Sequence, residues 1–299
     1  MSYIINIIRG FCMALADSVP GVSGGTIAFV LGFYDKFINS LDDLAFGSKQ
    51  TKKKALSFLV KLGIGWGIGM ILAVLVLTNL FESHIYSVSS LFIGFIIFSI
   101  PIIIKEEKDN LKGKYKNIIF MILGIIIVSI ITYFNPISGS ENIVNINNLN
   151  IFLAIYIFLS AMIAISAMVL PGISGSTLLL IFGLYMPIIS AIKEVLHFNL
   201  SYLPSIIIFG LGVLTGIVLV IRLIKIALKK YRSQTIYMII GLMIGSIYAI
   251  IMGPTTLSSN TMPLSLNNFN IICFIIGGII IVGLEKLKSI LKKKEMKEE

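Results

Sequence analysis

One seven-residue motif occurs twice in this chain, and each copy interrupts an apolar segment. The first copy is Pro20–Thr26 (PGVSGGT), and the second is Pro171–Thr177 (PGISGST), 151 residues later. Proline removes a backbone donor and glycine adds backbone entropy, so both are poor guests inside a helix. Hydrocarbon tolerates such breaks only where protein or a water-filled cavity satisfies the freed backbone groups. A matched pair of broken apolar segments in two halves of a chain is typical of a transporter's binding site.

The composition is that of a protein embedded in lipid. Of the 299 residues, 57% are apolar and only 13% are charged, whereas roughly a quarter are charged in a soluble protein. The two cysteines, Cys12 and Cys273, lie within apolar runs and predict neither a disulfide framework nor a metal site. The first apolar run is not followed by a small-residue cleavage site, so we do not interpret it as a removable signal peptide.

The apolar runs divide the chain into two similar halves. We predict a first repeat over 1–140, a second over 150–290 and a charged tail over 291–299. Each half begins with a hairpin broken by the motif and continues with three spans. In the first half these are the hairpin 4–39 and the spans 55–80, 88–104 and 118–134, and in the second the hairpin 151–196 and the spans 205–226, 236–252 and 271–284.

The hairpins are expected to return to the side from which they enter. The arm Ile4–Ala16 is too short for a core about 30 Å thick at about 1.5 Å per residue, and 26–39 reads as a second short helix. The arms of the second hairpin are long enough to span, so the choice between re-entrant and spanning stays open there. Either choice leaves an odd number of further spans in each half. The sequence therefore predicts an all-α polytopic membrane protein with an inverted-topology repeat.

Lysine and arginine indicate the orientation. They number four in 41–54, five in 105–116, five in 222–232 and six after Leu284, whereas the loops around His84, Asn147 and Ser259 have none. Cytoplasmic loops carry this excess, so both termini are expected in the cytoplasm of a prokaryotic cell. The net charge of +10 is then a feature of the cytoplasmic leaflet, and nucleic acid is not needed to explain it.

The motif residues are typical of an anion site. Pro20 ends one helix and Ser23 can cap the next, whose free amides and positive end attract a phosphate or carboxylate. The alternative is that both motifs are tight breaks that serve packing; two inverted copies favour function. The candidate phosphate-binding residues are Arg9, Ser18, Pro20, Gly21, Ser23, Gly24, Gly25, Thr26, Pro171, Gly172, Ser174, Gly175, Ser176 and Thr177. No metal and no cofactor is expected.

Asp17 and three arginines are the other charged residues considered. Asp17 lies in apolar surroundings, and an intramembrane carboxylate is a functional hypothesis by default, here for proton coupling. The alternative is a helix cap, or a partner for Arg9 or Lys61. Arg9 could hold a phosphate bidentately or extend its charge to the interface. Arg222 and Arg232 are predicted to lie on the solvated basic face.

A hydrolase is a competing interpretation of the motif. Gly21–Gly25 fits the G-x-S-x-G pattern, and both copies fit the shorter G-x-S-G of intramembrane serine proteases. A nucleophilic serine needs a base within reach. The only histidines, His84 and His197, are both in segments expected to face outward. We therefore predict that the protein is not an enzyme.

At these residues the chain resembles the bacterial and archaeal polyprenyl-phosphate transporters. The first signature covers Arg9–Gly10, Met13, Ala16–Asp17, Val19–Ala28 and Gly32–Tyr34, and the second covers Leu170–Ser176 and Gly183–Tyr185. The resemblance extends over nearly the whole chain. It implies a translocase that returns undecaprenyl phosphate, the lipid carrier of cell-wall synthesis, from the outer to the cytoplasmic leaflet of the plasma membrane.

The residues and the resemblance together predict a transporter whose substrate is a polyprenyl phosphate lipid in the bilayer, with protons as a candidate coupling ion. A carrier of a small soluble anion, an intramembrane hydrolase using Ser23 and a structural scaffold are the alternatives. The oligomeric state and the isoprenoid chain length stay open.

Overall fold

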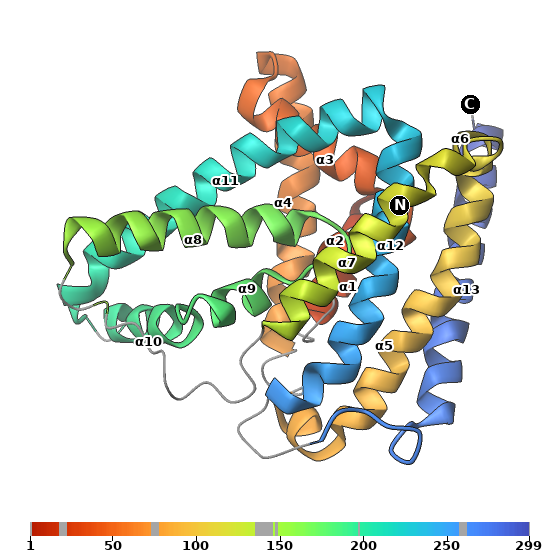
Figure 1. The fold of residues 1–299 in the computed structure, drawn as a ribbon. Helices are drawn as coiled ribbons and strands as arrows, with labels where there is room; N and C mark the ends of the chain where they lie inside the picture. The colour runs from red at the N-terminus through yellow and green to blue at the C-terminus, as the bar shows by residue number, and fades with distance from the viewer. Residues whose placement is uncertain are drawn as a thin grey trace.

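The computed structural model describes residues 2–17, 23–72, 78–134, 146, 149–196, 198–256 and 262–298. All regular structure in these residues is helical (Figure 1), which confirms the predicted all-α fold class. The helices are α1 Ser2–Asp17, α2 Gly24–Val30, α3 Tyr34–Phe46, α4 Lys49–Leu72, α5 Thr78–Glu106, α6 Lys108–Leu111, α7 Ile118–Tyr133, α8 Ile151–Val169, α9 Gly175–Ile181, α10 Tyr185–Leu196, α11 Leu203–Lys230, α12 Arg232–Met252 and α13 Ile271–Glu298, with short 3-10 turns at Tyr115–Asn117, Leu200–Tyr202 and Gly253–Thr256.

Helix length and composition make this a multi-pass membrane protein. Within the described residues, six segments are long and apolar enough to cross a bilayer. They are Lys49–Leu72, His84–Glu106, Tyr115–Tyr133, Ile151–Val169, Leu200–Lys230 and Arg232–Thr255. The first arm of the second hairpin, α8, is therefore long enough to span. The apolar part of α13, Ile271–Gly283, is shorter than these six.

The helices pack in four main pairs. The most extensive contacts are those of α1 with α4, α8 with α11, α5 with α13 and α7 with α12. Figure 1 shows α8 beside α11 on one side of the molecule and α5 beside α13 on the other. If the chain repeats as predicted, α1, α4, α5 and α7 correspond to α8, α11, α12 and α13. The α1–α4 pair then corresponds to α8–α11, and each of the other two pairs joins one helix from each half.

Glycines make equivalent close approaches in corresponding pairs. A methyl group at Gly65 of α4 would overlap the carbonyl oxygen of Ile7, and one at Gly212 of α11 would overlap that of Phe158. Gly94 and Gly241 likewise face backbone carbonyls of α13 and α7. Small residues at such contacts let membrane helices approach closely. These matched contacts are those expected of two similar halves; the inverted orientation of the halves in a bilayer stays a prediction.

The second arm of each hairpin differs from the prediction. Residues 26–39 were expected to form one short helix, but α2 ends at Val30 and α3 starts at Tyr34. The interruption contains Gly32, which has a φ of 66°, and the second hairpin breaks in the same way at Gly183, which has a φ of 64°. Glycine adopts this left-handed conformation at little cost, and it is a common helix stop.

Several other helix bounds differ from the expected spans. Helix α4 begins at Lys49, six residues before the predicted span 55–80, and is described as far as Leu72, while residues 78–80 of that span belong to α5. Helix α5 is kinked at His84, where φ is −136° and ψ is 32°. Helix α13 continues through most of the predicted tail, because lysine and glutamate are good helix formers.

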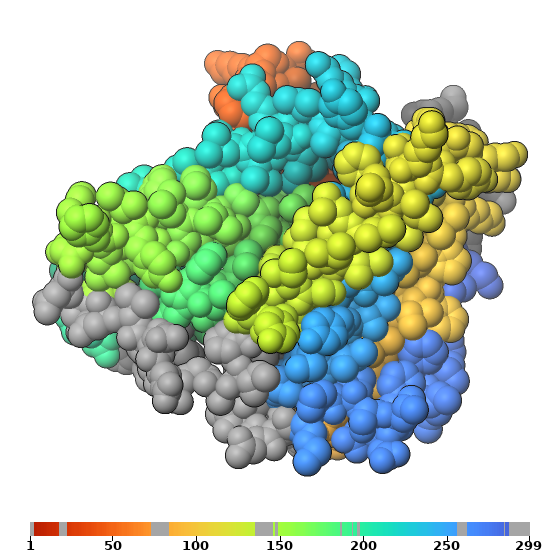
Figure 2. All heavy atoms as spheres, viewed as in Figure 1, coloured from red at the N-terminus to blue at the C-terminus, as the bar shows by residue number. Residues whose placement is uncertain are grey.

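The basic segments lie at one end of the molecule. In Figure 1 the α3–α4 connection, α6, the α11–α12 connection and the end of α13 all lie toward the top of the view. Helix α5 begins and α12 ends toward the bottom. In Figure 2 the first hairpin is almost hidden behind α7, α8 and α11, and every residue of α2 is buried.

Candidate functional site

The first break joins the end of α1 to the start of α2. Ser23 caps α2 with an extended backbone (φ −131°, ψ 150°), and its Oγ accepts a hydrogen bond from the Thr26 amide at 3.3 Å. This is the cap that the sequence predicted, and it satisfies one amide that the first helical turn leaves without an intrahelical partner. Both side chains are buried. The predicted site residues Ser18, Pro20 and Gly21 lie outside the described residues.

Asp17, the last residue of α1, also bonds to the start of α2. Its Oδ1 accepts a hydrogen bond from the Gly24 amide at 2.6 Å, and its Oδ2 accepts one from Trp66 Nε1 of α4 at 2.9 Å. The sequence allowed Asp17 to be a helix cap or a partner for Arg9 or Lys61, and these contacts are those of a helix cap. The carboxylate therefore occupies the position that an anion takes at the start of a helix.

The second break differs from the first in its capping groups. Gly172 has a φ of 89°, and a methyl group there would lie 2.5 Å from the carbonyl group of Leu242 in α12. Ser174 precedes α9 but makes no side-chain cap bond; its hydroxyl lies 2.8 Å from that of Ser176. The second copy thus lacks both the capping hydroxyl and, because Met168 replaces the acid, the capping carboxylate.

The two breaks contact each other directly. Thr26 Oγ1 accepts a hydrogen bond from the Gly172 amide at 2.8 Å, and the Ser23 hydroxyl donates to the Leu170 carbonyl at 3.3 Å. Tyr34, just after the helix interruption at Gly32, donates a hydrogen bond to the Val169 carbonyl at 3.1 Å. Residues 135 to 147 positions apart in the chain therefore form one buried polar cluster, in which the motif groups are paired with one another.

The remaining predicted site residues lie in and around this cluster. Gly25 packs against the Val169 carbonyl, since a methyl group at Gly25 would lie 2.9 Å from that oxygen. Pro171, Gly175 and Thr177 are buried. The Arg9 guanidinium stacks over the ring of Phe33, the residue before Tyr34, 4.9 Å from the centroid, and donates to Asn6 at 3.2 Å.

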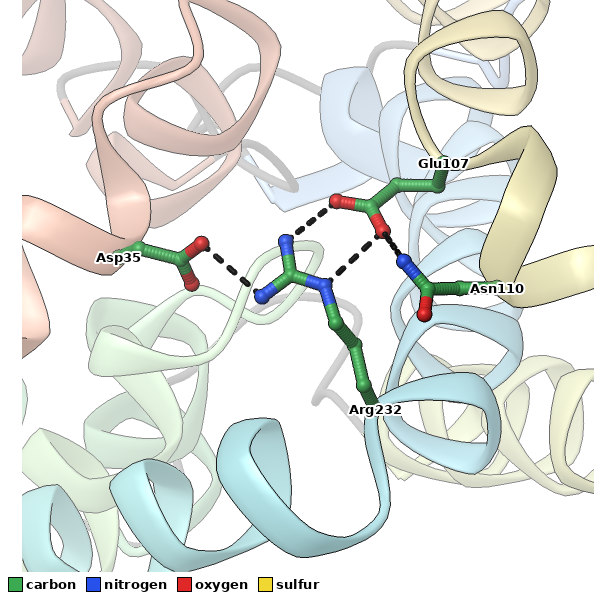
Figure 3. A network of polar contacts seen from close by, with 4 residues as sticks. All are labelled: Asp35, Glu107, Asn110 and Arg232. Atoms are coloured by element: carbon green, nitrogen blue, oxygen red, sulfur yellow. Dashed lines mark hydrogen bonds and ion pairs between the residues drawn. The ribbon is translucent and has the colours of Figure 1, made fainter.

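A second polar cluster was not predicted. Arg232, which was expected on the solvated face, lies between Glu107 and Asp35 and makes an ion pair with each (Figure 3). Asn110 donates to the same Glu107 carboxylate at 2.8 Å. The Arg232 partners are 125 and 197 residues away along the chain. No local sequence signal could have indicated these pairs.

A cavity of about 140 Å³ adjoins this second cluster. The first hairpin, α5 and α12 contribute its lining, which is made by Phe29, Gly32, Tyr34, Asp35, Ile103, Glu106, Glu107 and Arg232. Tyr34 therefore links the two clusters, because it also bonds to the second break.

The surroundings of Ser23 bear on the hydrolase alternative. The described contacts of its hydroxyl are with Thr26 and the Leu170 carbonyl. Neither partner is a base that could take a proton from a nucleophilic serine. His84 lies at the kink of α5 with its side chain exposed, and His197 is outside the described residues. Among the described residues, no group of three or more His, Cys, Asp or Glu side chains could hold a metal ion.

Comparison with known proteins identifies the family. Residues 13–268 match the family described as VCA0040-like, undecaprenyl phosphate translocase-like. A Staphylococcus aureus protein named polyprenyl-phosphate transporter is 35% identical over 290 residues, which are 95% of this chain and 97% of that protein. A Vibrio cholerae protein with the same name is 31% identical over 268 residues, which are 86% of this chain and 80% of that protein. No solved structure matches this chain. The chain therefore belongs to the undecaprenyl phosphate translocase-like family, whose members are transporters rather than enzymes.

Proposed function

We propose that this protein moves undecaprenyl phosphate, or a related polyprenyl phosphate, from the outer to the cytoplasmic leaflet of a prokaryotic plasma membrane. The recovered lipid carrier would be used again in cell-envelope synthesis. The observation that supports this most is the contact between the two breaks: in a family of transporters, Gly172 of one half bonds to Thr26 of the other at a buried position. The names of the two relatives supply the substrate class.

The headgroup would bind where the breaks meet. The Gly24 and Gly172 amides are satisfied by Asp17 and Thr26 in this conformation. Both acceptors are side chains that can rotate away, which frees two backbone donors for a phosphate. We place the site at Ser18, Pro20, Gly21, Ser23, Gly24, Gly25, Thr26, Pro171, Gly172, Ser174, Gly175, Ser176 and Thr177, with Arg9 meeting the phosphate outside the breaks. The isoprenoid tail stays in the surrounding lipid.

The test is transport by the purified protein in vesicles. A fluorescent polyprenyl phosphate is placed in one leaflet of the vesicles, and the measured quantity is the fraction of its headgroups accessible from that side. This fraction is expected to fall much faster in vesicles that contain the protein than in protein-free vesicles. A soluble monophosphate is the matched competitor, because it carries the same headgroup without a tail. Equal lipid movement with and without protein would exclude lipid transport, and transport of the soluble monophosphate itself would favour the small-anion carrier.

The proposed orientation is tested with single cysteines. The one-sided distribution of basic segments in Figure 1 supports a cytoplasmic position for the end of the molecule where the C-terminus lies. In intact cells, cysteines at Ser140 and Ser259, which lie outside the described residues, are expected to react with an impermeant thiol reagent. A cysteine at Ser48, between α3 and α4, is expected to react only after the cells are opened. Labelling of Ser48→Cys in intact cells would contradict the inverted arrangement.

Proton coupling through Asp17 is a further part of the proposal. Moving a phosphate monoester inward, with a charge of roughly −1.5 to −2 at neutral pH, is opposed by about 2.3 kcal/mol per charge for each 100 mV of negative-inside potential. A proton carried with the lipid would offset much of this cost. Asp17 is the carboxylate at the first break, where it bonds to the Gly24 amide that we assign to the headgroup.

Asp17→Asn is expected to lose the acceleration of inward transport by an inward proton gradient. The Gly24 and Trp66 donors approach different oxygens of the carboxylate, and asparagine replaces one of these oxygens by an NH2 donor, so some loss of rate is expected for structural reasons alone. Trp66→Phe is the matched control, because it removes one donor and keeps the carboxylate. The measurement is headgroup accessibility under imposed pH gradients. If Asp17→Asn responds to the proton gradient as the wild type does, Asp17 is a helix cap and not the coupling residue.

A further inference from the structure

The cluster around Arg232 ties three separate elements together. Arg232 is the first residue of α12, Glu107 follows α5, and Asp35 is in the first turn of α3. Arg232 Nε and Nη2 both donate to the Glu107 carboxylate, at 3.0 and 2.5 Å, and Nη1 donates to Asp35 Oδ2 at 3.1 Å. Figure 3 shows the guanidinium between the two carboxylates. The first hairpin is thereby connected to α5 and α12 at the end of the molecule that carries the basic segments.

The two sides of this cluster are not equally fixed. The Glu107 side chain is 14% exposed, receives two bonds from Arg232 and accepts a third from Asn110. The Asp35 side chain is 49% exposed and receives one bond from Arg232. A bidentate arginine–carboxylate pair is the stronger and more specific of the two arrangements, and an exposed single pair is weak. Glu107 thus orients the guanidinium, and the Asp35 contact is the one that can open.

Opening this contact would change the adjoining cavity. Asp35, Gly32 and Phe29 line the cavity from the first hairpin, and Ile103 and Glu107 line it from the α5 side. Separation of Asp35 from Arg232 would remove this link between the hairpin and α12, and a movement of the hairpin away from α5 and α12 would then enlarge the cavity. Because Tyr34 joins the cavity to the second break, this movement also loosens the contact between the two breaks.

The charge of the cavity lining favours a gate over an anion site. Asp35, Glu106 and Glu107 oppose the single guanidinium of Arg232, for a formal charge of −2. This lining has no net positive charge to bind a phosphate, so the cavity is not itself the headgroup site.

The cluster has no counterpart in the other half. The offset of 151 between the two motifs relates Asp35 to Met186. The offset of 147 that separates Gly94 from Gly241 relates Arg232 to Ile85 and Glu107 to Pro254. None of these three is charged. The first hairpin therefore has an ionic contact with its neighbouring helices, and the residues at the related positions of the second hairpin cannot form the same contact.

We propose that the Arg232–Asp35 ion pair is a latch that keeps the first hairpin closed against α5 and α12 on the cytoplasmic side. It opens so that the lipid headgroup can leave into the cytoplasmic leaflet. The place of this step in transport rests on the proposed function. The latch itself is a property of the protein without substrate, so the two ideas can fail separately.

The test uses a cysteine inside the cavity of the full-length protein. Ile103, which lines the cavity and is 2% exposed, is replaced by cysteine after Cys12→Ser and Cys273→Ser. Inside-out membrane vesicles are then treated with an impermeant maleimide, without any substrate. Asp35→Asn is expected to raise the labelling rate by up to about fivefold, the range of an exposed ion pair, and Arg232→Gln to raise it further.

Asp42→Asn is the matched control. Asp42 is on the same helix as Asp35 and pairs with Lys225 of α11, away from the cavity. Its loss is expected to leave the labelling rate unchanged. The latch is excluded if Asp35→Asn has no effect, or if Asp42→Asn raises the rate as much.

A second measurement links the latch to transport. Asp35→Cys with Arg232→Cys, joined by a short reducible cross-linker, is expected to stop headgroup movement until the link is reduced, whereas each single variant treated in the same way keeps transporting. Continued transport by the cross-linked double variant would show that the hairpin need not move here. If the maleimide result holds but no lipid is transported even by the wild type, the latch stands and the proposed substrate does not.

Discussion

Gly24→Leu and Gly175→Leu are expected to reduce polyprenyl-phosphate transport to the level of protein-free vesicles, while the protein still inserts and folds. A side chain at Gly24 would enter the space of the Asp17 carboxylate, 2.8 Å from Oδ2. That carboxylate is the end of a side chain that can rotate away, so the fold survives while the headgroup site is filled. A side chain at Gly175 meets the Ala164 carbonyl at 2.9 Å, so this variant also has a packing cost of about 1–3 kcal/mol.

The chain supplies matched controls for these substitutions. Gly63 of α4 and Gly210 of α11 have no atom within 4 Å of where a side chain would begin. Gly63→Leu and Gly210→Leu are therefore expected to transport normally. If the Gly24 and Gly175 variants also transport normally, the two motifs are packing devices, and the proposed site is wrong.

Ser23→Ala is expected to be milder than the leucine variants. It removes a cap, which costs about 1 kcal/mol, and the bond to the Leu170 carbonyl. The backbone amides that we assign to the phosphate remain. A complete loss of activity confined to this variant, together with a covalent adduct trapped on Ser23 in the wild type, would instead support the hydrolase.

Gly65→Ala is expected to give the largest loss of stability among single-methyl substitutions in α4. The added methyl group would overlap the carbonyl oxygen of Ile7 in α1, so a backbone must shift, which costs about 1–3 kcal/mol or more. Gly63→Ala, two residues earlier in the same helix, meets open space, so it is expected to cause no loss of stability and to add up to about 1 kcal/mol, because alanine favours a helix more than glycine does. Trp66 is the only tryptophan in the chain, so unfolding in detergent can be followed by its fluorescence.

The corresponding pair in the other half extends this test. Gly212→Ala would overlap the Phe158 carbonyl of α8, whereas Gly210→Ala meets nothing within 4 Å. The same contrast is expected there, because Gly65 and Gly212 occupy related positions. Equal stability of Gly65→Ala and Gly63→Ala would show that α1 and α4 are not packed as closely as the structure places them.

Sequence reasoning could predict the features that depend on neighbours a few residues away. The motif repeat, its Ser23 cap and the all-helical membrane class follow from local backbone chemistry and from runs of apolar residues. The break at Gly32 was missed although its signal was present: a glycine recurs at the repeat position Gly183, and both adopt a positive φ. The break was not predicted because a glycine in an apolar run can indicate either close packing of helices or the end of a helix.

Other features were decided by the tertiary structure alone. Asp17 had cap, ion-pair and coupling interpretations in the sequence, and only the packing of α4 placed the Trp66 indole against it. Arg232 looked like one more residue of a basic loop, and its partners Glu107 and Asp35 are 125 and 197 residues away in the chain. The direct contact of Thr26 with Gly172 likewise required both halves to be docked. The reason is physical: backbone conformation and apolar periodicity are set within a few residues, whereas a hydrogen bond between distant segments depends on how whole helices pack.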